Sequence, residues 1–220
     1  MDSTLVNLSD HLVVYGGAIN VGIILMGNTA LMLDFDPGAI NAVSRLGIDE
    51  LDRIMFTHHH RDQACGAWRA AESGTKIVLP ETERALFDDV SSFWNNPKHR
   101  GHLYDFHPHH LTLAESLPVD EVYGDGDIIE WGPTRILVIS TPGHTDGSLS
   151  YVVDVDGQRT VFCGDTIYDE GKVWEVYSLQ KGTATTDYHG FMGSRDELVL
   201  SVTGLFVVAS GYCSCCSACS

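Results

Sequence analysis

The sequence predicts a mixed fold of strands and helices, of the α/β or α+β class, and two patterns support this prediction. Short apolar runs rich in Val, Ile and Leu alternate with Ala-rich, helix-like segments along most of the 220 residues. Glycines, prolines and Asp-Gly pairs separate these runs, as turns between elements require. The composition, 44% hydrophobic and 20% charged, is that of an ordinary globular chain. It excludes disordered, collagen-like and coiled-coil architectures, and one domain is the default at this length.

The first half of the chain is expected to open with an antiparallel meander, whose three strands are separated by Gly16-Gly17 and Gly27-Asn28. Strand and helix then alternate, with Pro37-Gly38 before a helix and Gly47 after it. The expected elements are strands at residues 11–15, 19–26 and 29–34, a helix at 39–46, a strand at 51–57, a helix at 63–72, a strand at 76–79 and a helix at 81–89.

Residues 91–113 differ from their surroundings because they are rich in aromatic residues and histidine, and we interpret them as a long connection or lid. Apolar strands return after this segment, and Asp156-Gly157 predicts a hairpin turn. The expected elements are strands at residues 119–123, 128–130, 135–140, 149–155 and 160–163 and a final helix at 191–202. We expect residues 1–210 to form the domain and the Cys/Ser-rich residues 211–220 to be a disordered tail.

The balance of 30 acidic against 13 basic residues gives a net charge of −17, which limits the classes of partner. A protein that binds the phosphates of nucleic acid needs a positive net charge, and so does a protein that binds an anionic membrane surface. No run approaches the roughly 20 apolar residues that span a bilayer, and the N-terminus lacks a secretory signal pattern. Four of the six cysteines crowd into residues 213–219, which is not a spread disulfide framework. We therefore expect a cytoplasmic protein that acts on a small molecule, without nucleic acid or membrane as partners.

Residues 57–63 read Thr-His-His-His-Arg-Asp-Gln and follow a strand-like apolar run, where a helix is expected to begin. In an extended segment, side chains two residues apart point the same way. His58, His60 and Asp62 can therefore converge on one side while His59 and Arg61 point away. Two imidazoles and a carboxylate suit a borderline Lewis acid such as zinc, whereas the alternative interpretation is a solvated polar loop.

Two later loops carry the same kind of side chain just after a strand. One contains Pro142, Gly143 and His144 after the run at 135–140, and the other contains Gly164-Asp165 after the run at 160–163. Strand ends followed by glycine-containing loops are where α/β scaffolds present chemistry. A single His or Asp in a loop is ordinary polar surface, but three such loops in succession favour a shared metal site.

These motifs together resemble the metallo-β-lactamase-fold hydrolase superfamily, whose hallmark is H-x-H-x-D-H, then a Pro-Gly-His-Thr loop, then a Gly-Asp after a strand. The resemblance covers about residues 10–200 and is greatest for uncharacterised bacterial members that carry His-His-His-Arg-Asp-Gln and a Phe-Trp-containing middle loop. It implies an α+β fold, an αββα sandwich with a metal site at one sheet edge.

The resemblance also implies a role for each matching residue. His58, His60 and His144 would hold the first metal ion, and Asp165 would bridge two ions. Asp62 would bind the second ion and orient or deprotonate water, which makes it the candidate catalytic residue. The implied cofactor is Zn²⁺, as one ion or two, with Fe²⁺ as the alternative.

The chain departs from the family pattern in two places, and both affect the second metal. Gln63 replaces the final His of H-x-H-x-D-H, and its amide oxygen would be a weaker zinc ligand. A last family His has no counterpart, because no His follows His189. The C-terminus thus departs from the family as if truncated or replaced, which leaves open whether the last elements of the sandwich are present. The first site keeps a complete set of ligands for one tetrahedral ion.

We therefore expect a metallo-hydrolase that uses metal-bound water on a small ester, thioester, lactone or amide, with one intact metal site. A bound divalent ion lowers the pKa of its water toward about 7 and polarises the carbonyl. One alternative is a mono-iron persulfide dioxygenase-like oxidoreductase, which the resemblance would place on His58, His144 and Asp165. The other is a catalytically impaired, truncated homologue.

Several further residues carry less specific signals. Asp34 would buttress the ligands by the resemblance, with a plain turn residue as the alternative. The middle-loop histidines could add a ligand or a second metal patch, although a pocket-covering loop is the simpler interpretation. They are His99, His102, His107, His109 and His110.

Overall fold

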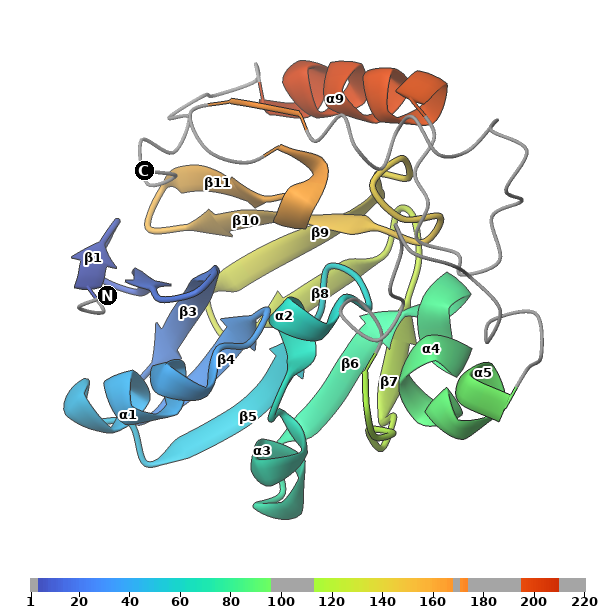
Figure 1. Ribbon diagram of the computed structural model, residues 1–220. Helices are drawn as coiled ribbons and strands as arrows, with labels where there is room; N and C mark the ends of the chain where they lie inside the picture. Colours follow the sequence, from blue (N-terminus) through green and yellow to red (C-terminus); the bar gives the residue numbers. More distant parts are fainter. Residues whose placement is uncertain (1–3, 96–112, 168–170, 174–194, 210–220) are drawn as a thin grey trace.

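The computed structural model describes residues 4–95, 113–167, 171–173 and 195–209. Two β-sheets stack face to face, with α1, α3, α4 and α5 on the outer side of the larger sheet and α9 on the outer side of the smaller one (Figure 1). This αββα sandwich confirms the expected α+β class. Among the described helices, none combines the length and apolarity needed to cross a bilayer.

The larger sheet has seven strands in the order in which they occur along the chain. The first four pair antiparallel: β2, β3 and β4 are the predicted three-stranded meander, and β1 extends it by one strand. Strands β4, β5, β6 and β7 then pair in parallel. The parallel half follows from the helical crossovers between its strands. The strands are β1 (Thr4–Asn7), β2 (Leu12–Gly16), β3 (Asn20–Met26), β4 (Thr29–Leu33), β5 (Glu50–Met55), β6 (Lys76–Pro80) and β7 (Glu121–Tyr123).

The smaller sheet is antiparallel, in the order β11-β10-β9-β8. Asp156 and Gly157 make the β10–β11 turn, both with positive φ, as the predicted hairpin requires. The strands are β8 (Ile128–Trp131), β9 (Thr134–Ser140), β10 (Leu149–Val155) and β11 (Gln158–Phe162).

The alternation of side chains along the strands produces two separate apolar layers. In β4, Ala30 and Met32 face the helices, whereas Leu31 and Leu33 face the second sheet. A strand buried on both faces reads as an unbroken apolar run because successive side chains leave opposite faces. The apolar layer between the two sheets includes Tyr151 of β10, which is fully buried.

Short helices cover the larger sheet. Asp36 caps α1 by accepting a hydrogen bond from the backbone N–H of Gly38, and Pro37 occupies the first turn, where a missing N–H costs nothing. The helices and 3-10 turns are α1 (Pro37–Arg45), α2 (Arg61–Ala64), α3 (Trp68–Glu72), η1 (Glu81–Glu83), α4 (Arg84–Asp88), α5 (Val90–Asn95), η2 (Gly164–Thr166) and α9 (Arg195–Ala209).

Several expected boundaries were wrong. The single helix expected at 63–72 is divided between α2 and α3, because Cys65 takes an extended conformation (φ −61°, ψ 121°). The segment interpreted as a connection begins with helix α5, and its residues 96–112 lie outside the described residues. The last helix continues to Ala209, and the tail at 211–220 also lies outside the described residues. Strand β1 was not anticipated, because only one of its four side chains is even half-buried.

Candidate metal centre

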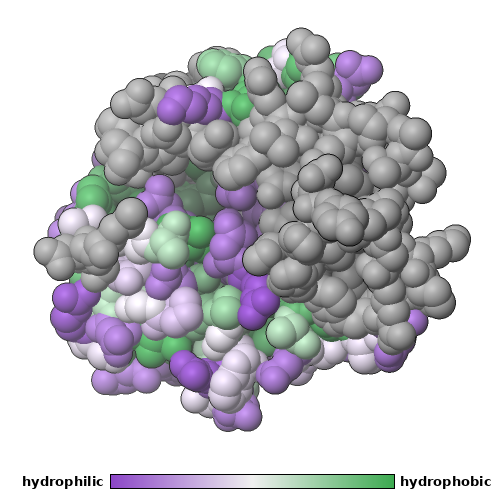
Figure 2. All heavy atoms as spheres, viewed as in Figure 1, coloured by the Kyte–Doolittle hydropathy of each residue, from purple (hydrophilic) through white to green (hydrophobic). Residues whose placement is uncertain are grey.

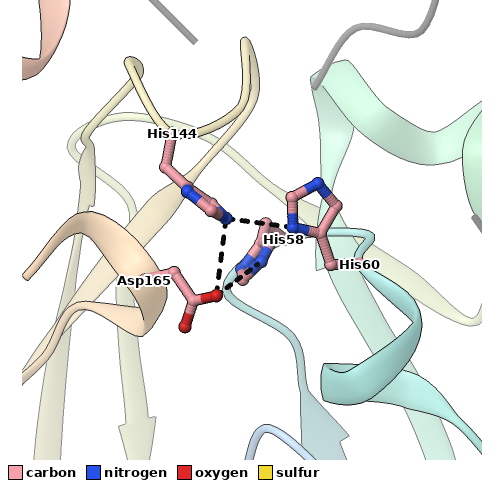
Figure 3. Close-up of side chains that lie close together, drawn as sticks. All are labelled: His58, His60, His144 and Asp165. Atoms are coloured by element: carbon pink, nitrogen blue, oxygen red, sulfur yellow. Dashed lines mark hydrogen bonds and ion pairs between the residues drawn. The ribbon is translucent and has the colours of Figure 1, made fainter. Parts of the chain in front are cut away.

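Four candidate ligands from three loops point toward one another at one edge of the sandwich (Figure 3). His58 and His60 follow β5, His144 lies between β9 and β10, and Asp165 lies in η2 after β11. In the view of Figure 1, hydrophilic side chains run down the middle of this face, over the region of α2 (Figure 2). The structure thus brings together four of the six ligands expected from the sequence.

Contacts between the two sheets hold this edge closed. The backbone N–H of Leu149 at the start of β10 donates to the carbonyl of Thr57 at 2.8 Å. The Tyr151 hydroxyl donates to the carbonyl of Phe56 at 2.7 Å. Gly164 has a positive φ of 49°, and a Cβ there would overlap Oγ1 of Thr57. Glycine is therefore needed before Asp165 for β11 to approach the His58 loop so closely.

The ligand atoms are spaced as one small cation requires. All four lie within 4.8 Å of one another. Nε2 of His144 is 2.9 Å from Nδ1 of His60 and 3.5 Å from Oδ2 of Asp165, and Nε2 of His58 is 3.9 Å from the same Oδ2. Metal–nitrogen bonds of about 2.0–2.1 Å in a tetrahedral site imply ligand separations of about 3.3 Å. The described cluster therefore needs only small adjustments to surround an ion.

The electrostatics of the cluster favour neutral imidazoles beside a carboxyl that needs a cation. Burial, followed by the neighbouring imidazoles, lowers the pKa values of His58 and His60 well below the usual range and that of His144 to about 3. Neutral imidazole is the form that binds metal. Burial, followed by the charge of Asp62, raises the pKa of Asp165 to about 7.

His58 provides the sharpest test of whether a metal fits. Its Nε2 is completely buried and makes no hydrogen bond within the described structure, although buried polar atoms are nearly always satisfied. Its other ring nitrogen, Nδ1, lies 3.0 Å from Oγ1 of Thr57. The Thr57 hydroxyl in turn donates to Asp34 at 2.9 Å. A hydroxyl that gives its hydrogen to a carboxylate accepts one from Nδ1, which leaves the Nε2 lone pair for a ligand bond. The residues therefore fit a bound cation.

Asp34 anchors this chain of hydrogen bonds and agrees with the buttressing role expected for it. It is buried, has a positive φ of 60°, and accepts hydrogen bonds from both the backbone N–H and the hydroxyl of Thr57. Its burial raises its pKa to about 8, against the lowering effect of these hydrogen bonds. A cation next to His58 would favour the ionised carboxyl.

The sequence model of the metallo-beta-lactamase superfamily matches residues 14–203. The chain belongs to this superfamily. It is 30% identical over 140 residues to the hydroxyacylglutathione hydrolase of Brucella ovis, a match that covers 63% of this chain and 41% of that protein. The match thus spans less than half the length of this superfamily relative.

Two solved structures of the superfamily share the fold. The di-zinc subclass B3 metallo-beta-lactamase LRA-12 from an Alaskan soil metagenome has a TM-score of 0.66 at 18% identity, covering 91% of this chain and 73% of that one. A Cronobacter sakazakii metallo-beta-lactamase with a HARLDQ motif has a TM-score of 0.62 at 18% identity, covering 93% and 75%. Residues 58–63 of this chain, His-His-His-Arg-Asp-Gln, share the Asp-Gln ending with that motif.

The other two superfamily ligands expected from the sequence, Asp62 and Gln63, lie beside the four-residue cluster. The extended conformation ends at His60, so Asp62 falls in the first turn of α2. Although the residue is exposed, nearby protein atoms desolvate its carboxyl and raise its pKa. Gln63 is buried, and its amide nitrogen donates to Oδ1 of Asp165 at 3.4 Å. The described residues thus put a neutral amide beside the carboxylate that the superfamily pattern assigns to both metals.

Two side chains that support the cluster, Thr57 and Glu83, had no role expected from the sequence. Thr57 adjoins the histidine run, so its position could have drawn attention to it. No local signal marks Glu83, which reads as an ordinary helix-start glutamate yet is 2% exposed. The remaining candidate histidines lie outside the described residues and are His99, His102, His107, His109, His110 and His189.

Proposed function

We propose that this protein is a metal-dependent hydrolase that holds one divalent cation, with zinc as the first candidate. The observation that carries the proposal is the convergence of four ligand atoms within 4.8 Å, with the buried Nε2 of His58 lacking a hydrogen bond. The ligands would be Nε2 of His58, Nδ1 of His60, Nε2 of His144 and a carboxylate oxygen of Asp165.

A cation bound there supplies a water of lowered pKa and polarises the carbonyl of the substrate. Asp62 is the candidate proton acceptor, because it follows His60 by two residues, in the first turn of α2, and lies close enough to raise the pKa of Asp165. The pKa of Asp62 is itself raised toward neutral pH, and a carboxylate whose pKa is close to the working pH accepts and releases a proton more readily.

We propose a single tightly held cation rather than two. Gln63 stands where the superfamily pattern has a histidine. Its amide donates a hydrogen bond to Asp165, and its hydrogen bonding to Asp62 partly offsets the rise that burial causes in the pKa of Asp62. An amide N–H between two carboxylates partly offsets their repulsion and competes with a second ion for their oxygens.

Activated acyl compounds are the proposed substrate class. The hydroxyacylglutathione hydrolases to which the chain is similar are named for a thioester substrate, and the structural neighbours include beta-lactamases. A net charge of −17 disfavours anionic substrates, so neutral and cationic thioesters, esters and lactones come first.

The test is metal analysis of untagged protein together with a panel of thioester, ester, lactone and β-lactam substrates. His144→Ala is expected to lose both the tightly bound ion and hydrolysis. His11→Ala is the matched control, because His11 is a surface residue paired with Asp156 at 2.7 Å, away from the cluster. Hydrolysis that survives His144→Ala would refute the proposal, and iron content with O₂ uptake would replace it with the mono-iron oxygenase.

A further inference from the structure

Glu83 is a buried carboxylate that joins the two loops carrying three of the proposed ligands. It ends η1, directly after β6, and is 2% exposed. Its Oε2 accepts hydrogen bonds from the backbone N–H of His59 at 2.7 Å and lies 2.9 Å from Nδ1 of His59. Its Oε1 accepts from the Thr145 hydroxyl and from the backbone N–H of Gly147 at 3.1 Å.

Three of these four contacts are made next to a proposed ligand, and the fourth, to Gly147, lies in the same loop as His144. His59 lies between His58 and His60 in the chain, and Thr145 follows His144. One carboxylate therefore spans the gap between the two loops, at sequence separations of 24 and 62 residues. Nδ1 of His60 and Nε2 of His144 meet at 2.9 Å on the far side of this bridge.

The surrounding residues are built around the carboxylate. The Thr145 hydroxyl also lies 2.6 Å from Oγ of Ser148, which accepts from the backbone N–H of Thr145 at 3.2 Å. A Cβ at position 147 would overlap Cγ of Glu83, so the glycine lets the backbone N–H reach the carboxylate. A buried charge that is fully hydrogen-bonded holds its neighbours firmly, because every alternative arrangement leaves it unsatisfied.

We propose that Glu83 is a positioning residue for the metal centre: it fixes His60 and His144 at ligand separation before a cation binds. The inference rests on the proposed function, since it concerns affinity for the proposed ion. Groups that orient metal ligands typically change metal affinity by about 10–100-fold when altered. Glu83 itself is not one of the four clustered ligands, and it acts through His59, Thr145 and Gly147.

Glu83→Gln is the direct test. An amide has one acceptor oxygen and one donor nitrogen. Its oxygen can accept the hydrogen bonds of one loop, but its nitrogen then faces the hydrogen-bond donors of the other loop. We expect the zinc dissociation constant, measured by chelator competition, to rise by about 10–100-fold. The metal-free variant should still melt cooperatively.

Asp36→Asn is the matched control, because Asp36 is also a buried carboxylate that accepts two backbone hydrogen bonds, from Ala18 at 2.9 Å and Gly38 at 2.7 Å. Its zinc affinity should stay near that of the wild type even if its melting temperature falls. An equal loss of affinity in both variants, or none in Glu83→Gln, would overturn the proposal.

If Glu83→Gln does not fold, a second pair of variants tests whether Glu83 positions the ligands. Thr145→Val removes the hydroxyl that Glu83 accepts, whereas Thr145→Ser keeps it. The valine variant should bind zinc several-fold more weakly than the serine variant, and equal affinities would refute the positioning role. Wild-type protein that binds no zinc would instead refute the proposed function.

Discussion

Replacing Thr57 with valine tests the hydrogen-bonded chain behind the metal centre. Valine has nearly the shape of threonine, so the change is confined to the hydroxyl. That hydroxyl lies 3.0 Å from Nδ1 of His58 and 2.9 Å from Oδ2 of Asp34, in a residue that is 1% exposed. The substitution leaves the imidazole N–H without an acceptor and removes one donor from the carboxyl.

The contacts of the Thr57 hydroxyl set the size of the expected losses in stability and zinc affinity. A buried donor left unpaired costs about 1–3 kcal/mol, and the lost hydrogen bond to Asp34 adds about 1 kcal/mol. Asp34 keeps the backbone N–H of Thr57 at 2.8 Å, which limits the loss. We expect Thr57→Val to lower the free energy of unfolding by about 2–4 kcal/mol. Zinc affinity should fall by about 10–100-fold, because the proton on Nδ1 is no longer held and can move to Nε2.

Urea unfolding of the metal-free proteins measures the first quantity, and chelator competition measures the second. Thr57→Ser is the control, since it keeps the hydroxyl and loses only a methyl group, at about 1 kcal/mol. Its zinc affinity should stay close to that of the wild type. If the valine and serine variants agree in both stability and affinity, the hydrogen-bonded chain does not orient His58.

Three further predictions follow. Burial raises the pKa of Asp34 to about 8 and that of Asp165 to about 7, so the metal-free fold holds these protons more tightly than the unfolded chain. Its stability should therefore fall as the pH rises from about 6.5 to 8. The two carboxyls lose about 2.5 kcal/mol over this range, and the buried histidines return about 1 kcal/mol, because their imidazoles still bind protons near pH 6.5 only in the unfolded chain, so the net fall is about 1 kcal/mol; a flat profile in urea melts would contradict these shifts. Gln63→His should raise tightly bound zinc from one ion per chain toward two by mass spectrometry, and an unchanged content would show that Gln63 does not exclude the second ion. Tyr151→Phe should cost about 1–2 kcal/mol of stability without changing zinc affinity, because its hydroxyl satisfies the Phe56 carbonyl; a loss of affinity would assign Tyr151 to the metal centre instead.

Local sequence patterns were sufficient to locate ten of the eleven described strands and the loops that carry chemistry. The strands expected at residues 29–34 and 51–57 become β4 and β5 with ends that shift by one or two residues, and the strand expected at 149–155 becomes β10 without a shift. Their alternation follows from the period-two geometry of a strand, which needs no knowledge of distant residues. The same local reasoning placed His58, His60, His144 and Asp165 just after strand ends, where the structure has them.

The alternation of side chains along an extended backbone no longer applies where the backbone becomes helical after His60. His60 is the last extended residue, so Asp62 leaves the line of the two histidines and enters α2. Only the folded backbone decides this boundary, because helix α2 is four residues long and carries no strong start or stop signal. The division of the expected helix at 63–72 has the same origin.

The sequence by itself determined the strands, the order of the three ligand-bearing loops and the residue types that suit a cation. Only the tertiary structure decided which polar side chains support those ligands. Glu83 meets Thr145 across 62 residues and Gln63 meets Asp165 across 102, and Thr57 is the residue through which the expected support, Asp34, reaches His58. The periodicity of a sequence reports which side of its own element a residue faces, whereas a buried hydrogen bond depends on which other element packs there.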